Sequence, residues 1–152
     1  MFDNIIGQLS EINFPLIIGS FIFYFLGGYL LYGSLFAAIG AASDNDTDTQ
    51  QFMLPLTVPL IVGMFVMINS SMNPFSRLSV IFSIIPLTSP IVMMARIPFG
   101  VPFIEILTSV LLLVLTFLGT TWLAGKIYRT GILMYGKKVN YAELWKWIRY
   151  KT

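Results

Sequence analysis

Two charged residues, Arg96 and Glu105, are the first candidates for chemistry in this sequence, because long apolar runs surround them. A charged side chain at membrane depth is by default a candidate for an ion or substrate pathway. Glu105 could offer carboxylate oxygens to a cation at the start of the last apolar run. The alternative, which we favour, is an ion pair between Arg96 and Glu105 that only supports the fold.

Two threonines and two prolines inside apolar runs are further candidates for a pathway or a gate. Thr57 and Thr120 could line a path with neutral hydroxyl oxygens, although a helical threonine equally often bonds to its own backbone. Pro55 and Pro59 lie one helical turn apart. Because proline removes a backbone hydrogen bond and kinks a helix, this pair predicts either a bent helix beside a cavity or a kink that the start of a helix tolerates.

The sequence lacks the side chains that most catalytic sites need. It contains no histidine and no cysteine, which excludes serine–histidine and cysteine–histidine nucleophiles, histidine-bound zinc and disulfides. It also has no phosphate-binding loop of the G-x-x-x-x-G-K-[ST] type. We therefore expect no enzyme activity, no metal and no directly bound cofactor. Any work driven by ATP would require a partner protein.

The composition is that of a membrane protein. Of the 152 residues, 57% are hydrophobic and 11% are charged, and the mean hydropathy is +0.82. A soluble domain carries about 25% charged residues to cover its surface. The fold class that we predict is therefore all-α integral membrane, with one membrane domain over residues 1–152.

Three apolar runs are long enough to cross a hydrocarbon core of about 30 Å as helices. The predicted transmembrane helices are residues 14–42, 52–69 and 104–125. Residues 1–13 contain two acidic residues and no basic one. They are therefore interpreted as an extracellular or interfacial lead rather than a signal peptide.

Residues 70–103, before the last predicted span, are apolar but rich in helix breakers. These breakers include Pro86, Pro90, Pro98, Gly100 and Pro102. We predict a re-entrant region on the extracellular side, in which two short helices enter the membrane and return. The alternative is a fourth span over residues 78–95, which would reverse the side of the preceding acidic loop. The prolines favour three spans.

The charges of the chain are concentrated in two segments. Residues 43–51 hold an acidic cluster, which lacks the glycine and the glutamate of a calcium loop and predicts a solvated cytoplasmic turn that caps the next helix. Residues 126–152 contain seven basic residues against one acidic residue, which indicates a cytoplasmic tail rather than a nucleic-acid site. In this tail, Asn140 and Glu143 predict the start of an amphipathic helix, which lies on the cytoplasmic face or docks on a soluble partner.

Small residues recur every four positions in the first predicted span. One row consists of Gly33, Ala37 and Ala41, and the neighbouring row consists of Ser34, Ala38 and Ala42. Such rows let another helix approach closely in lipid. We interpret them as a packing face within the chain, and a homodimer interface is the alternative.

Four segments carry a family signal: Phe25–Ala42, Asp48–Pro59, Ser89–Pro102 and Gly119–Lys138. They resemble the C-terminal part of ABC-2 type transporter permeases, and most closely the sodium-efflux (NatB-like) permease group. The resemblance implies that the three predicted spans correspond to the fourth, fifth and sixth spans of such a permease. Because the first three spans and the coupling helix of that family are absent, we expect the chain to be a piece of a longer permease.

The function that the resemblance implies is that of a permease subunit in the inner (cytoplasmic) membrane, with its C-terminus in the cytoplasm. Such a subunit would export sodium or another small substrate with ATP hydrolysed by a separate ATPase subunit. Its other partners would be a second permease subunit and the lipid membrane, and no nucleic acid is expected. The alternative, from a different functional class, is a helical assembly or regulatory module that transports nothing and needs no ATPase.

Overall fold

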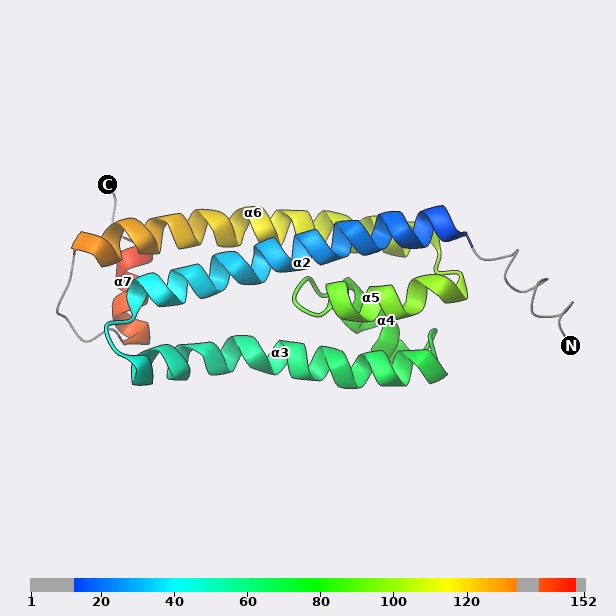
Figure 1. Cartoon of the computed structure of the whole chain (residues 1–152), viewed down its shortest axis with the longest axis horizontal. Helices are drawn as coiled ribbons and strands as arrows, with labels where there is room; N and C mark the ends of the chain where they lie inside the picture. Colours follow the sequence, from blue (N-terminus) through cyan, green and yellow to red (C-terminus); the bar gives the residue numbers. More distant parts are fainter. Residues whose placement is uncertain (1–12, 134–139, 150–152) are drawn as a thin grey trace, which may run out of the picture.

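Every element in the described part of the chain is a helix. The computed structural model describes residues 13–133 and 140–149. The elements are α2 (Phe14–Ala42), α3 (Asp46–Met72), α4 (Arg77–Ile84), α5 (Ser89–Arg96), the 3₁₀ helix η1 (Ile97–Phe99), α6 (Phe103–Leu133) and α7 (Tyr141–Arg149). Figure 1 shows α2, α3 and α6 running along the long axis, with α7 at one end. We call that end the α7 end, and the opposite end, where α2 begins, the hairpin end.

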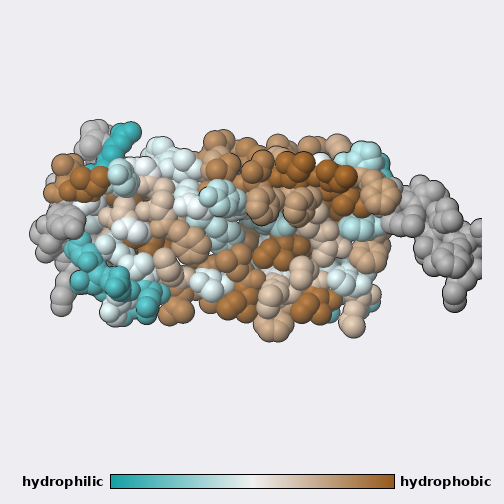
Figure 2. Space-filling model, viewed as in Figure 1, coloured by the Kyte–Doolittle hydropathy of each residue, from teal (hydrophilic) through white to brown (hydrophobic). Residues whose placement is uncertain are grey.

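Within the described residues, three helices are long and apolar enough to cross a membrane, the same number as the predicted spans. They are α2, α3 and α6, with 29, 27 and 31 residues. Many of their large apolar side chains are exposed, and Figure 2 shows apolar residues along the bundle with hydrophilic residues gathered at the α7 end. An apolar surface of this extent is unfavourable in water and suits a lipid environment.

The alternative fourth span over residues 78–95 does not form. Helices α4 and α5 have eight residues each, which is about 12 Å of helix against a core of about 30 Å. The chain turns between them at residues 85–88. Figure 1 shows this α4–α5 hairpin entering from the hairpin end and turning back near the middle of the bundle.

Helices α3 and α6 extend beyond the predicted boundaries. α3 begins at Asp46 rather than at residue 52, so Asp46 and Asp48 of the acidic segment 43–51 lie in the first turn of a helix, where acidic side chains interact favourably with the helix dipole. α6 continues past residue 125 to Leu133. Basic residues do not by themselves end a helix. A single glycine such as Gly131 makes the helix less stable than alanine would by only about 1 kcal/mol.

The tip of the α4–α5 hairpin is held between α2 and α3. The Tyr32 hydroxyl on α2 donates a hydrogen bond to the Leu87 carbonyl oxygen at 2.7 Å. Gly28 lies directly against Pro90, because a Cβ atom added at Gly28 would stand 2.9 Å from the Pro90 ring. Gly63 on α3 faces Thr88, and a Cβ atom added at Gly63 would lie 3.6 Å from the Thr88 side chain, an ordinary van der Waals distance. The glycines of the long helices therefore make room for the hairpin.

Helix α7 packs on the end of the bundle through a tryptophan. Trp147 is buried in a cluster with Ala38, Ala42 and Ile127, whereas Trp145 is exposed. The Tyr141 ring also meets Phe52 of α3 edge-on at 4.8 Å. α7 therefore connects all three long helices at the α7 end.

Candidate functional site

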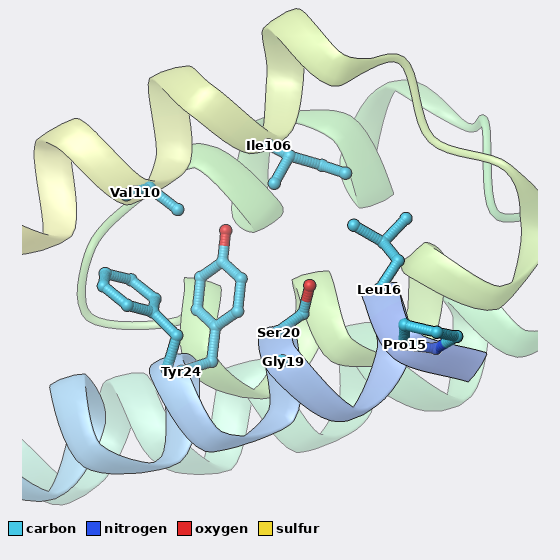
Figure 3. Close-up of a pocket in the computed structure, with 8 residues that line it drawn as sticks. Pro15, Leu16, Gly19, Ser20, Tyr24, Ile106 and Val110 are labelled. Carbon is cyan, nitrogen blue, oxygen red and sulfur yellow. The ribbon is translucent and has the colours of Figure 1, made fainter. Parts of the chain in front are cut away.

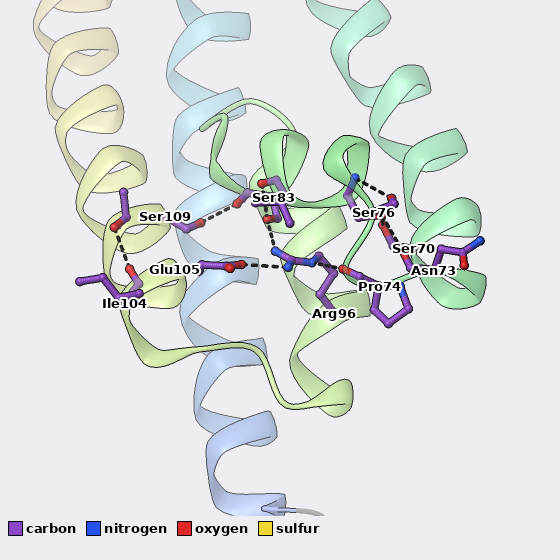
Figure 4. Close-up of polar contacts among 12 residues, drawn as sticks. Ser70, Asn73, Pro74, Ser76, Ser83, Arg96, Ile104, Glu105 and Ser109 are labelled. Carbon is purple, nitrogen blue, oxygen red and sulfur yellow. Dashed lines mark hydrogen bonds and ion pairs between the residues drawn. The ribbon is translucent and has the colours of Figure 1, made fainter.

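The most unusual side chain of the bundle is Arg96, which is completely buried at the last residue of α5. Its guanidinium group contacts three other segments, as Figure 4 shows. Nε donates to the Pro74 carbonyl oxygen at 2.6 Å and Nη1 donates to Ser83 Oγ at 2.5 Å. Nη2 lies 2.8 Å from Glu105 Oε2 in an ion pair. We call these four residues the Arg96 site.

The Arg96 site joins four segments of the chain through one charged group. Pro74 belongs to the turn after α3, Ser83 to α4, and Glu105 to the first turn of α6. A guanidinium group suits this arrangement because its donors form a rigid planar fork. A charge taken out of water is tolerated when it is paired and hydrogen-bonded. The ion pair therefore ties the end of α5 to the first turn of α6.

Glu105 is the partly exposed member of the pair. Its side chain is 23% exposed, whereas that of Arg96 is 0% exposed. The structure thus brings together the two charged residues that the sequence singled out. It joins them in the ion pair that we favoured and places them at the hairpin end, with the paired oxygen Oε2 of Glu105 buried.

A group of serines surrounds the Arg96 site and was not predicted. Ser70 donates to Ser79 Oγ at 2.8 Å, Ser79 donates to the Asn73 carbonyl oxygen at 3.0 Å, and Ser109 donates to the Ser83 carbonyl oxygen at 2.8 Å. The sequence signal was present, because serines at positions 76, 79 and 83 share one face of a helix. The hydroxyls satisfy polar groups that would otherwise be buried without partners.

The other candidate residues lie away from the Arg96 site. The Thr57 hydroxyl donates to the Met53 carbonyl oxygen at 2.9 Å within α3, and Pro55 and Pro59 lie inside the same continuous helix rather than at its start. Thr120 donates to the Phe117 carbonyl oxygen and accepts a hydrogen bond from Ser34 at 3.0 Å. Thr120 is fifteen residues along α6 from Glu105, or about 22 Å of helix.

The two rows of small residues on α2 have different environments. Ala38 and Ala42 are buried and Ser34 is half-buried against α6, so this row packs within the chain. Gly33 and Ala37 are exposed. Among the described residues, no group of three or more acidic side chains is placed to hold a metal ion.

Comparison with known sequences gives a family for the chain. The profile of the family described as "ABC-2 family transporter protein" matches residues 1–126. The chain is 27% identical over 130 residues to the uncharacterized protein YhaP of Bacillus subtilis, a match that covers 85% of this chain and 31% of that protein. It is 26% identical over 118 residues to the uncharacterized protein MJ1024 of Methanocaldococcus jannaschii. That match covers 77% of this chain and 29% of that protein. The chain thus spans about a third of the length of these relatives. No solved structure matches it significantly.

Proposed function

Because the chain belongs to the ABC-2 family of transporter proteins, we propose that it forms part of the permease of an ABC exporter. The observation that carries this proposal is the family match over residues 1–126, which includes all of α2 and α3 and most of α6. Three apolar helices long enough to cross a membrane support it. A permease of this kind moves its substrate by a change of conformation and needs no catalytic side chain of its own.

The energy for this change would come from a separate ATPase subunit. ATP binding by that subunit would shift the permease between inward-open and outward-open packings, because the nucleotide-bound partner favours one of them. The α7 end, with its short acidic turn at residues 43–45 and its basic helix α7, is the cytoplasmic end in this proposal. The α4–α5 hairpin would then re-enter the membrane from the outside. A second permease subunit completes the proposed assembly.

The proposed substrate is sodium or another small solute. Glu105 is the acidic side chain at the hairpin end among the described residues, and its side chain is partly exposed. It is therefore the residue at which a cation would meet negative charge. Arg96 neutralises that charge in the present conformation, so a cation would bind there only after the ion pair has separated.

Purification from the native organism tests the proposal. A tag would be placed at the C-terminus in the chromosome, and the tagged protein would be isolated in mild detergent for mass measurement and identification of its partners. We expect an ATPase with a phosphate-binding loop to co-purify. A 17.1 kDa chain without any ATPase would contradict the proposal and favour an assembly or regulatory module.

The proposed orientation predicts opposite labelling at the two ends of the bundle. The chain has no native cysteine, so single cysteines can be introduced by Asp46→Cys at the α7 end and Asn73→Cys at the hairpin end, both at exposed positions. A membrane-impermeant maleimide added to intact cells should label Asn73→Cys. Asp46→Cys should react only after the membrane has been opened. Labelling of Asp46→Cys in intact cells would contradict the orientation.

A further inference from the structure

We propose that the end of α6 and the last turn of α7 together bind the headgroup of an anionic phospholipid. Four basic residues form this surface, which we call the basic corner: Lys126 and Arg129 on α6, and Lys146 and Arg149 on α7. Helix α7 begins beside α3, where Tyr141 meets Phe52. It ends beside α6, where Trp147 packs against Ile127. The last turn of α7 therefore lies next to the part of α6 that holds the other two basic residues.

Most of the positive charge of the basic corner has no acidic partner among the described residues. Arg129 and Arg149 are exposed, and neither forms an ion pair within the part of the chain that the structure describes. Lys146 lies 3.5 Å from Glu143, but its side chain is 70% exposed. The acidic first turn of α3 is on the far side of the bundle, since Figure 1 shows α2 between α3 and α6. The basic corner therefore attracts anions.

The basic corner lies at the depth of lipid headgroups. The uncharged run of α6, residues 106–125, has 20 residues, and its helical length of about 30 Å equals the thickness of the hydrocarbon core. Lys126 follows at the boundary of the core, and Arg129 lies about 5 Å further along the helix. The headgroup layer extends about 5–8 Å beyond the core on each side. Both side chains are therefore in the layer that holds the phosphates.

Two exposed tryptophans accompany the basic residues and favour a lipid as the bound partner. The Trp122 side chain on α6 is 64% exposed, and Lys126 Nζ lies 5.2 Å from the centre of its ring. Trp145 is equally exposed and lies one turn before Arg149, on the same face of α7. Tryptophan beside Lys and Arg is typical of the boundary between a membrane and water. An acidic soluble partner would account for the cations but not for the exposed tryptophans at this depth.

The hairpin end offers no comparable surface among the described residues. Arg96 is buried there and paired with Glu105, so Arg77 is the exposed basic residue of that end. A pocket of about 260 Å³ opens between α2 and α6 at this end, and no charged residue lines it. Figure 3 shows its walls, which include Leu16 and Val110. An anionic headgroup is therefore expected to bind at the α7 end.

The proposal requires that α6 spans a bilayer, and it does not depend on an ATPase partner. In the orientation proposed above, the basic corner faces the cytoplasmic leaflet, which carries a negative surface potential. Helix α7 contacts all three long helices. A headgroup bound at the basic corner would therefore also stabilise their packing at the α7 end.

Native mass spectrometry of the full chain in detergent tests this binding. The protein is titrated with phosphatidylglycerol or phosphatidylcholine, and the dissociation constant of the first bound lipid is measured. We expect phosphatidylglycerol to bind more tightly, and Arg129→Gln and Arg149→Gln each to weaken its binding about fivefold. Arg77→Gln, the matched control, removes an exposed arginine at the hairpin end and should leave both constants unchanged. Equal affinities for the two lipids, or equal effects of the three variants, overturn the proposal.

Fluorescence quenching in nanodiscs tests the same site in a bilayer. Trp122→Phe leaves two tryptophans, of which Trp147 is 4% exposed and Trp145 is 64% exposed, so quenching by aqueous acrylamide reports mainly on Trp145. We expect weaker quenching in phosphatidylglycerol than in phosphatidylcholine, because a bound headgroup covers this face of α7, and Arg149→Gln should reduce the difference. Equal quenching in the two lipids contradicts the proposal. Loss of a co-purifying ATPase in Arg149→Gln, with lipid affinity unchanged, would assign the basic corner to a protein partner instead.

Discussion

Replacement of Arg96 by methionine will lower the free energy of unfolding by about 3–5 kcal/mol, the range that removal of one partner of a buried ion pair produces. Methionine fills much of the volume of the arginine side chain but donates no hydrogen bond. The Pro74 carbonyl oxygen, the Ser83 hydroxyl and the Glu105 carboxylate each lose a contact with the guanidinium group. Reversible unfolding of the purified protein in detergent, followed by circular dichroism, measures the change.

Two further variants separate the ion pair from the general effect of losing a charge. Arg77 is exposed at the first residue of α4, so Arg77→Met makes the same substitution where no burial is involved and should change stability little. Glu105→Gln in the Arg96→Met background should recover part of the loss, because it removes the unpaired carboxylate. If Arg96→Met and Arg77→Met were equally mild, Arg96 would not hold the hairpin.

Glu105→Gln in the wild-type background distinguishes a structural pair from a cation pathway. A structural role predicts that lower stability is its main consequence, since Arg96 then stays buried without a counter-charge. A pathway role predicts loss of transport by the assembled exporter under conditions in which the protein remains folded. Both effects together would mean that separation of the pair belongs to the transport cycle.

The sequence predicted the Arg96–Glu105 pair because charge is rare and costly among apolar residues. The serines around it are neutral and common in membrane helices, so they attracted no prediction although Ser76, Ser79 and Ser83 have helical spacing. Their roles depend on which segment faces them, and this is set by tertiary packing. The Ser70–Ser79 contact, for example, requires α4 to fold back against the end of α3.

The long helices were predictable because span length is fixed by bilayer thickness, whereas their ends were not. The boundaries at residues 52 and 125 were placed where polar residues begin, but a helix continues through polar residues when its first turn is acidic or its side chains reach solvent. The two rows on α2 show the same limit. Both have the spacing of a packing face. The row of Ser34, Ala38 and Ala42 packs within the chain along its length, whereas Gly33 and Ala37 of the other row are exposed and only Ala41 of that row meets α6, at Gly131.

The two ends of the bundle are held by different kinds of contact. At the hairpin end, one buried charge joins α5 to α6 and to the turn after α3. At the α7 end, the backbone of α6 at Gly131 lies close to the backbone of α2 at Ala41, and Trp147 of α7 packs against both helices. If the chain acts in a permease as proposed, a change of access at one end requires its own contacts to separate while the other set holds.

Gly131→Ala should separate α2 from α6 at the α7 end. A Cβ atom at Gly131 would stand 2.5 Å from the Ala41 carbonyl oxygen and 3.7 Å from the Trp147 ring. The first contact is with backbone, which cannot rotate away as a flexible side chain does. The helices must therefore move apart, and we expect a loss of about 1–3 kcal/mol in the free energy of unfolding.

The matched control is Gly125→Ala, six residues earlier on α6, where a Cβ atom meets nothing within 4 Å. Alanine is the better helix former by about 1 kcal/mol, so Gly125→Ala should be neutral or stabilising. Replacing Trp122 and Trp145 with phenylalanine leaves Trp147 as the only tryptophan, because the chain has three. Its emission should shift to longer wavelength in Gly131→Ala as the ring loses its buried site, and not in Gly125→Ala. Identical spectra and stabilities for the two variants would mean that α2 and α6 do not approach closely there, and that α7 is held by some other contact.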